Sequence, residues 1–305
     1  MRKTFVNSLL KFASAYPELM VLSGDLGYSV FEPLIEKFPN QFINVGIAEQ
    51  NMIGISAGLA LSGKKVFVYS ITPFSTIRPL EQIRMDVCYH NLPVRIVGTG
   101  AGLSYGTLGP SHHGTEDLAI MRAMPTMIVT APADRFELEK ILDAAMNISS
   151  PMYIRIGRST EPDVYSVLPA LELGKANVIY DEGDDFAIIA CGNMVHTALC
   201  AAKKLQALSK KGKVISMHTI KPLDCDLVVT LAKTMPTFTL EEHSIIGGLG
   251  SAVAECIADN CISPPYFERF ALKDAFQKKI GKHDYLRDIN DLTVDKIVDK
   301  ILKRI

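Results

Sequence analysis

The sequence predicts an α/β protein made of two three-layer α/β/α domains, the first built on a parallel sheet and the second on a mostly parallel one. Short apolar runs alternate with longer segments of helical periodicity, which is typical of β-α-β units with right-handed crossovers. A length of 305 residues favours two domains, and a hydrophobic fraction of 48% is ample for two cores. We predict domains at 1–160 and 175–305, joined by a proline-containing linker at 161–174.

The first domain is expected to begin with an amphipathic helix, because its apolar side chains recur on one helical face: Phe5, Leu9, Phe12, Ala13 and Tyr16. Lys11 interrupts the apolar run, so the segment is interpreted as this helix rather than as a secretion signal. Strands are expected at 19–23, 42–45, 65–71, 93–98, 127–130 and 151–158, with helices between them.

The second domain repeats the alternation. Strands are expected at 176–180, 186–191, 213–217 and 237–240, and helices at 194–209, 224–233, 250–259 and 293–305. The stretch 241–250 looks like a glycine-rich phosphate loop, but its acidic residues argue against phosphate binding. We assign it no catalytic role.

Composition excludes several classes of function. The net charge is −1, from 32 basic and 33 acidic residues, so we expect neither a nucleic-acid surface nor a polybasic membrane patch. No apolar run reaches transmembrane length. The six cysteines are scattered and form no Cys-x-x-Cys pair, which is typical of reduced thiols in a cytoplasmic protein.

The central feature is a strand, 42–45, that runs through Gly46 into a helix with Glu49 in its first turn. That helix carries no charge between Glu49 and Lys64, and a helix apolar on every face is expected to be buried on every face. Because ligands bind outside the carboxyl ends of strands in open α/β sheets, Glu49 is a candidate site residue. The alternative is an acid that only stabilises the helix N-terminus.

The sequence around Glu49, Val-Gly-Ile-Ala-Glu-Gln-Asn at 45–51, resembles the strand–helix junction in the pyrimidine-binding domain of thiamine-diphosphate enzymes, above all transketolases and deoxyxylulose-phosphate synthases. The resemblance implies that Glu49 hydrogen-bonds a pyrimidine nitrogen of the cofactor. It would thereby favour the imino tautomer, whose exocyclic nitrogen deprotonates the thiazolium. That role needs a carboxyl group that shares a proton near neutrality, and we expect burial to raise its pKa.

Two further cofactor contacts are implied by the resemblance. Phe74 matches the aromatic residue that stacks on the aminopyrimidine, because the helix after it, 79–84, is similar to the family's. Its alternative is ordinary core packing. Asp25 ends the strand at 19–23 and matches acids that help to position the cofactor, and its alternative is a turn or cap residue.

A long glycine-rich loop, 99–114, contains Gly-Pro-Ser-His-His, which resembles the family's substrate-binding stretch. The resemblance implies that His112 and its neighbour Ser111 contact the substrate, and His112 could donate to a carbonyl or shuttle a proton. Leu108 stands where the family commonly has Asp for a substrate hydroxyl. Ala101 and Gly100 stand where Arg or His often binds a phosphate, so the acceptor's hydroxyl pattern and phosphorylation stay open.

Arg155 and Arg158 lie three residues apart at the end of the strand 151–158. The family binds a sugar phosphate here, so both arginines are candidate substrate ligands, and Arg158 is the better match. The alternative is one arginine with a buried partner and one solvated charge.

No oxygen-ligand set for Mg²⁺ and a diphosphate is visible. Gly24-Asp25 lacks the second glycine of the family's Gly-Asp-Gly motif, and Asn51 falls inside the Glu49 helix. The chain therefore resembles the C-terminal subunit of a split transketolase. A partner subunit with Gly-Asp-Gly and Asn would hold Mg²⁺ and the diphosphate of thiamine diphosphate. The pair would transfer a two-carbon ketol unit from a ketose to an aldose, as sugars or sugar phosphates, in an α2β2 assembly joined at the Glu49 helix.

Three alternatives remain open at this point. A deoxyxylulose-phosphate-synthase-like enzyme would use pyruvate as the donor. The beta-type chain of a 2-oxo acid dehydrogenase would transfer an acyl group to lipoamide. A non-catalytic relative would serve only in assembly or regulation, although the joint presence of Glu49, Phe74 and His112 argues against it.

Overall fold

The first sheet has seven strands in the order β10-β5-β6-β4-β3-β1-β2. The computed structural model describes residues 1–27, 30–158 and 161–305, so the predicted domain end at residue 160 lies outside the described residues. All neighbouring strands are parallel except β10 and β5, which are antiparallel. The strands are β1 (Leu19–Ser23), β2 (Phe42–Asn44), β3 (Lys65–Ile71), β4 (Val94–Thr99), β5 (Ile128–Thr130), β6 (Met152–Ile156) and β10 (Thr219–Lys221).

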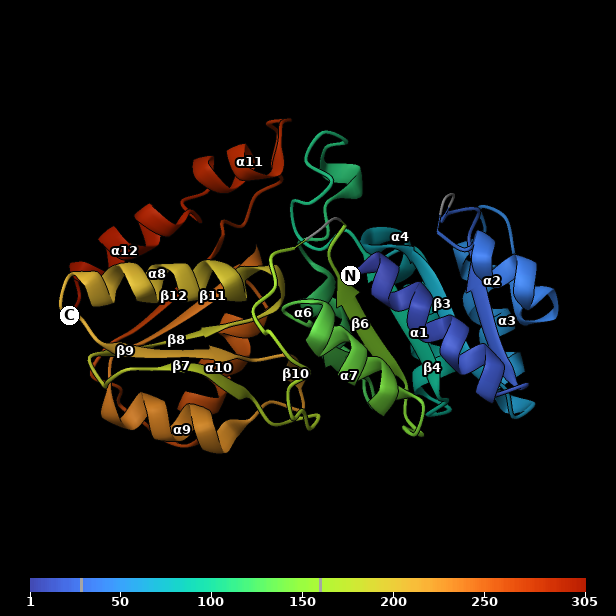
Figure 1. Cartoon of the computed structure of the whole chain (residues 1–305), viewed down its shortest axis with the longest axis horizontal. Coiled ribbons are helices and arrows are strands. Elements are labelled where there is room, and N and C mark those ends of the chain that lie inside the picture. The colour runs from blue at the N-terminus through green and yellow to red at the C-terminus, as the bar shows by residue number, and fades with distance from the viewer. Residues whose placement is uncertain (28–29, 159–160) are drawn as a thin grey trace.

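Helices cover both faces of this sheet (Figure 1). One face packs against α1 (Arg2–Ala15), α2 (Glu32–Lys37) and α7 (Arg135–Ala145). The other face packs against α3 (Glu49–Leu61), the π-helical turn η2 (Ile83–Cys88) and α6 (Asp117–Ala123). Three short helices lie at the ends of strands or in loops: α4 (Thr72–Thr76), α5 (Leu80–Gln82) and the 3₁₀ turn η3 (Pro110–His112). A further 3₁₀ turn, η1 (Pro39–Gln41), precedes β2.

The second sheet has five strands in the order β12-β11-β8-β9-β7, all parallel except for the pair β7 and β9. Its strands are β7 (Asn177–Asp181), β8 (Phe186–Ala190), β9 (Gly212–Ser216), β11 (Thr237–Ser244) and β12 (Phe267–Leu272). Its helices are α8 (Val195–Ala207), α9 (Cys225–Thr234), α10 (Leu249–Asp259), α11 (His283–Ile289) and α12 (Val294–Leu302), with a 3₁₀ turn, η4 (Gly192–Met194), before α8.

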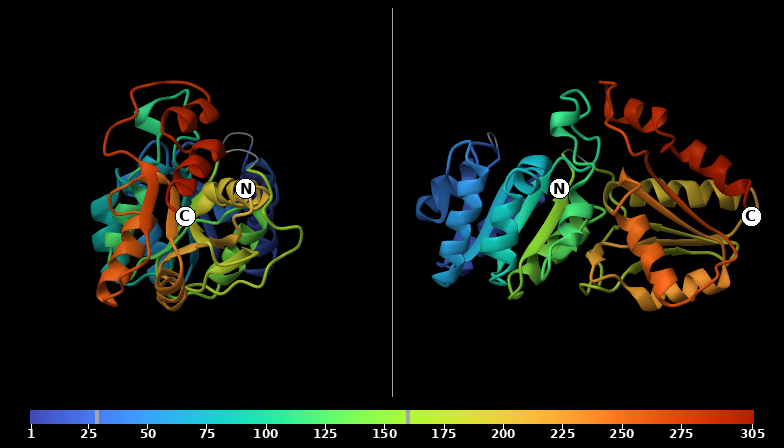
Figure 2. Two further views of the ribbon diagram at one scale, coloured as in Figure 1. Left: turned by 90° about the vertical axis from the view of Figure 1, so that its left-hand side faces the viewer. Right: turned by 180° about the vertical axis from the view of Figure 1, so that it is seen from behind.

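The two halves share a core, and Figure 2 shows them side by side from behind. One continuous cluster of buried side chains includes Met121 and Val129 beside the first sheet and Ile189 and Met217 from the second. β10 also comes from the second half of the sequence but extends the first sheet through β5. The sequence did not predict β10, and because of it the first sheet is not purely parallel.

The two-domain α/β architecture is confirmed, and α1, β1 and β3 form where the periodicity predicts them. The single chain does not bury α3 on every face. Leu61 is 68% exposed, and a Cβ built on Gly58 would meet nothing within 4 Å. The part of α3 around Gly58 and Leu61 therefore has a face that no other described part of the chain covers.

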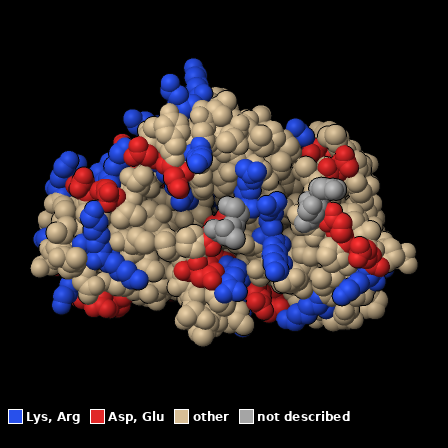
Figure 3. Space-filling model, turned by 45° about the horizontal axis from the view of Figure 1, so that its top comes forward, with Lys and Arg blue, Asp and Glu red and all other residues tan. Residues whose placement is uncertain are grey.

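Acidic and basic side chains are interspersed over the face of the molecule shown in Figure 3. Among the described residues, no helix combines the length and the apolar character needed to cross a membrane.

Candidate functional site

Glu49 is the first residue of α3 and lies just beyond the carboxyl end of β2. Its side chain is 5% exposed, and its Oε1 accepts a hydrogen bond from Arg78 Nη1 at 3.0 Å. A groove of about 400 Å³ opens beside it, lined by residues 47–51 and Arg78. The carboxylate is thus shielded from bulk water and yet borders an open groove.

Arg78 is a site residue that the sequence reasoning missed. Its guanidinium carbon lies 3.7 Å from the centroid of the Phe74 ring, while the same guanidinium bonds Glu49. Arg78 follows Phe74 by four residues, a spacing that brings side chains together on a helical turn, and this was the available signal. The guanidinium of Arg78 thus joins Glu49 to Phe74 at the carboxyl edge of the first sheet.

His112 lies against the same aromatic ring. Its imidazole meets Phe74 edge-on, with ring centroids 5.1 Å apart, and its Nδ1 is 3.0 Å from the hydroxyl of Ser111. Burial and, to a lesser extent, the charge of Arg78 lower the pKa of His112 below its ordinary value. The lowered pKa favours the neutral imidazole, which can both donate and accept a hydrogen bond.

Tyr105, also missed from the sequence, connects His112 to Arg158. Its ring centroid is 6.1 Å from that of His112, and the guanidinium carbon of Arg158 lies 4.7 Å from it. Gly100 makes this possible, because its φ is +89° and a Cβ there would lie 2.1 Å from the Tyr105 ring. Contacts thus run from Glu49 to Arg158 through Arg78, Phe74, His112 and Tyr105. Four of these six residues were predicted for the site: Glu49, Phe74, His112 and Arg158.

Arg155 does not fit the expectation of a substrate ligand. Its side chain is 1% exposed, and it donates to both carboxylate oxygens of Asp117 and to the backbone carbonyls of Gly114 and Glu242. Asp117 also accepts from the hydroxyl of Tyr153 at 2.7 Å. This geometry corrects the expectation in favour of the stated alternative, in which one of the two arginines has a buried partner.

Asp25 lies at the carboxyl end of β1, as predicted, but its contacts are those of a turn residue. It has a φ of +55°, its side chain accepts from Asn44 Nδ2 at 3.1 Å, and its amide donates to Asn44 Oδ1 at 3.0 Å. The hollow beside it is lined by Phe31, Phe42 and neighbouring residues rather than by Glu49. The geometry favours the turn alternative for Asp25.

The residues fit one half of a thiamine-type cofactor. A shielded carboxyl group, Glu49, beside an aromatic face, Phe74, suits a flat ring that can hydrogen-bond a carboxyl group. Over 1–27, 30–158 and 161–305, no cluster of three or more His, Cys, Asp or Glu side chains could hold a metal ion.

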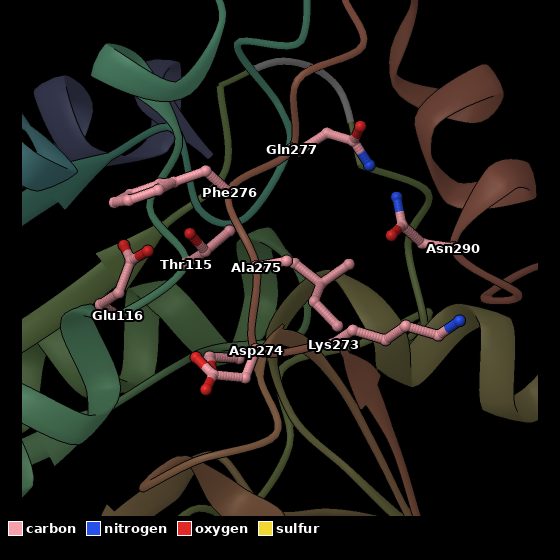
Figure 4. Close-up of a pocket in the computed structure, with 10 residues that line it drawn as sticks. Thr115, Glu116, Lys273, Asp274, Ala275, Phe276, Gln277 and Asn290 are labelled. Atoms are coloured by element: carbon pink, nitrogen blue, oxygen red, sulfur yellow. The ribbon is translucent and has the colours of Figure 1, made fainter.

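A cavity of about 320 Å³ lies between the two halves and is separate from this groove (Figure 4). Thr115 and Glu116 line it from the first half, and Asp274, Gln277 and Asn290 line it from the second. None of the side chains predicted for the site lines this cavity.

Known proteins resemble the chain over almost its whole length. Residues 1–162 match the family described as transketolase, pyrimidine binding domain, and 174–293 match transketolase, C-terminal domain. The 6-deoxy-6-sulfo-D-fructose transketolase subunit SqwH of Clostridium sp. (strain MSTE9) is 37% identical, covering 98% of this chain and 92% of that protein. A subunit of the apulose-4-phosphate transketolase of Phocaeicola vulgatus is 38% identical, covering 85% of this chain and 84% of that protein.

A solved structure described as a split gene transketolase, inactive beta4 tetramer, superposes with a TM-score of 0.90 at 37% identity. It covers 99% of this chain, and this chain covers 97% of it. These matches show that the chain belongs to the transketolase family and contains its pyrimidine-binding and C-terminal domains.

Proposed function

We propose that this chain is the C-terminal subunit of a thiamine-diphosphate-dependent transketolase, which transfers a two-carbon ketol unit from a ketose or ketose phosphate to an aldose. The observation that carries the proposal is the shielded carboxylate of Glu49 held beside the ring of Phe74 at the carboxyl edge of the first sheet. Fold alone does not give function, but matched site residues support it.

Each side chain has a part in this proposal. When bound, thiamine diphosphate supplies an electron sink for the carbon–carbon bond that breaks. Glu49 shares a proton with a ring nitrogen, and its burial keeps that hydrogen bond away from water. The face of Phe74 stacks on the ring, which contributes about 0.5–1.5 kcal/mol beyond burial.

The substrate side of the site is formed by the loop 99–114 and by Arg158. A neutral His112, oriented by Ser111 through their 3.0 Å contact, can donate to a substrate carbonyl or accept a hydroxyl proton. The guanidinium of Arg158 lies over the ring of Tyr105 and has N–H groups that suit a phosphate.

A second subunit completes the active enzyme in this proposal. The sequence lacks a complete Gly-Asp-Gly motif, and the described residues hold no cluster of three or more His, Cys, Asp or Glu side chains, so a partner with Gly-Asp-Gly and Asn would hold the metal and the diphosphate. Two of the relatives reported above are themselves named as transketolase subunits. The uncovered stretch of α3 around Gly58 and Leu61 is available for an α2β2 contact.

The test is to mix this chain with a purified N-terminal transketolase subunit, thiamine diphosphate and Mg²⁺, and to assay ketol transfer. Turnover is expected only when both chains are present. Glu49→Gln is expected to lower turnover by about a hundredfold or more, because the carboxyl group that shares a proton with the ring nitrogen is gone. The matched control is Glu81→Gln, an acid on α5 that is 66% exposed.

Several outcomes would contradict the proposal. Full turnover by Glu49→Gln removes the role of the carboxylate, and turnover by this chain alone removes the need for a partner. Assays with pyruvate and with lipoamide in the same mixture identify the two other reaction types.

A further inference from the structure

Arg78 fills the space between the two residues that the proposed cofactor ring would contact. Its Nη1 is 3.0 Å from Glu49 Oε1, and its guanidinium carbon is 3.7 Å from the centroid of Phe74. A planar group at that distance is already in stacking contact with the aromatic face. A second flat ring cannot lie on the same face of Phe74 while the guanidinium is there.

The guanidinium makes the two contacts that an aminopyrimidine ring would make. Both groups are flat, both can hydrogen-bond the Glu49 carboxyl group (the ring through a nitrogen that shares the carboxyl proton), and both stack on an aromatic side chain. Arg78 therefore satisfies the charge of the buried Glu49 and covers Phe74 in the absence of any ring. Without such a partner, a shielded carboxylate would be costly to keep ionised.

We propose that Arg78 is an internal occupant of the ring site, which keeps Glu49 and Phe74 in place and leaves when an aminopyrimidine ring binds. This inference rests on the proposed function, because it assumes that the ring binds at Glu49. It has a measurable consequence. The apparent affinity for the ring is reduced by the fraction of molecules in which Arg78 occupies the site.

The surroundings of Arg78 allow the exchange. Its side chain is 46% exposed and belongs to the turn between α4 and α5. Gln50 Nε2 donates to the backbone carbonyl of Arg78 at 3.3 Å, so the side chain can rotate while the backbone stays attached to α3. The groove of about 400 Å³ lined by residues 47–51 and Arg78 lies beside it and can receive the displaced guanidinium.

The experiment measures binding of 4-amino-5-(hydroxymethyl)-2-methylpyrimidine to the full chain by calorimetry and ligand-observed NMR. Arg78→Ala is expected to bind this ring about tenfold more tightly than the wild type, because the internal competitor is absent. Arg84→Ala is the matched control, since Arg84 is 57% exposed, pairs with Glu81 and does not line the groove. It is expected to bind as the wild type does.

Two further variants make the outcomes distinct. Arg78→Lys keeps the charge but loses the planar fork, and it is expected to bind the ring with an affinity between those of the wild type and Arg78→Ala. Glu49→Ala is expected to lose binding. A crystal of the wild type soaked with the same ring is expected to show the Arg78 guanidinium away from Glu49.

If Arg78→Ala binds the ring equally or more weakly while Glu49→Ala does not bind it, the inference about Arg78 is wrong and the proposed function stands. If the wild type, Arg78→Ala and Glu49→Ala all fail to bind although their thermal unfolding is normal, the proposed site itself is wrong, and the inference fails with it.

Discussion

The backbone N–H of Leu103 donates to Glu242 Oε1 at 2.6 Å, so a carboxylate from β11 fastens the loop that carries His112. The close approach requires glycine at position 102, where φ is +58° and a Cβ would lie 2.3 Å from Glu242 Oε1. His283 and Arg287 of α11 also donate to Glu242. The second half of the chain thus fixes the position of the substrate-binding loop proposed in the first half.

Removing Glu242 is expected to destabilise the protein strongly. Although burial alone would raise it, Arg287 and His283 hold the pKa of Glu242 well below its ordinary value, so the carboxylate is ionised and fully buried. Glu242→Ala leaves the Arg287 guanidinium, the His283 imidazole and one amide without this acceptor, which is expected to cost about 3–5 kcal/mol of unfolding free energy. Urea denaturation measures this.

The control for Glu242→Ala is Glu81→Ala, because Glu81 is an exposed acid with one surface ion pair. It is expected to change the unfolding free energy by less than about 0.5 kcal/mol. A similarly small loss of unfolding free energy in Glu242→Ala would show that the contacts of Glu242 contribute little to stability.

Glu137 is expected to make the unfolding free energy fall as the pH rises. Burial raises the pKa of this carboxyl to about 7, despite hydrogen bonds from Ser216, Tyr165 and the Ala133 amide. A raised acid pKa means that the folded state binds the proton more tightly. Its stabilising effect is therefore complete below the ordinary value of 4.5 and is lost as the pH rises through about 7.

The corresponding variant is Glu137→Gln. Between pH 4.5 and 8, the unfolding free energy of the wild type is expected to fall by about 3 kcal/mol more than that of Glu137→Gln, since one pKa unit corresponds to about 1.4 kcal/mol. Urea titrations across this pH range give the comparison. Parallel pH profiles for the two proteins would exclude Glu137 as the titrating group.

Local patterns were enough to predict much of the fold. β1 and β3 are continuous apolar runs, and both begin and end at the predicted residues. β10 was missed because three residues, Thr219–Lys221, carry no pattern of their own and pair with β5, far away in sequence. β12 lacks a clear alternation, because most of its side chains are only partly buried.

A site residue was predictable only where the residues next to it in the sequence identify its position in the fold. Glu49 follows the strand β2, and Phe74 lies in α4 between the strand β3 and the helix α5, so each could be named from its neighbours along the chain. The bond between Glu49 and Arg78 spans 29 residues and that between Leu103 and Glu242 spans 139, and no local pattern encodes either. Two arginines at the end of β6, residues 155 and 158, look alike in sequence, and only their burial separates them.

That difference in burial predicts a large loss of stability for one arginine substitution and a small one for the other. Arg155→Met breaks a buried ion pair with Asp117, in which Nε and Oδ2 are 2.8 Å apart, and is expected to cost about 3–5 kcal/mol of unfolding free energy. Arg158→Met is expected to change that free energy by less than about 1 kcal/mol and to raise the KM for a phosphorylated substrate. Thermal unfolding measures the change in stability, and steady-state kinetics of the two-chain complex measure the KM. Equal destabilisation by the two variants would contradict this division of roles.

The charge of Arg78 also acts on His112. Burial is the larger cause of the lowered His112 pKa, and Arg78 is the second. Arg78→Gln is therefore expected to raise the pKa of His112 part of the way back to its ordinary value of 6.5. An NMR titration of the imidazole protons follows this, with Arg84→Gln as the control. A pKa that is unchanged in Arg78→Gln would mean that the two groups are screened from one another.

The uncovered stretch of α3 makes a prediction about assembly. A Cβ at Gly58 would meet nothing within 4 Å, so the folded chain has room for a larger side chain there. Gly58→Ala is expected to stabilise the isolated chain by about 0.5–1 kcal/mol, because alanine is the better helix former. Gly58→Leu is expected to keep the fold but to block close packing of α3 against another chain.

Sedimentation velocity over a range of concentrations measures this association, and thermal unfolding measures the stability of each variant. The control is Leu208→Ala, which changes a side chain that is 52% exposed in the second half of the chain and lies just beyond α8. It is expected to associate as the wild type does. If Gly58→Leu also assembles normally, the contact between subunits does not use this stretch of α3, because a leucine side chain at that position would hold a second backbone away from the helix.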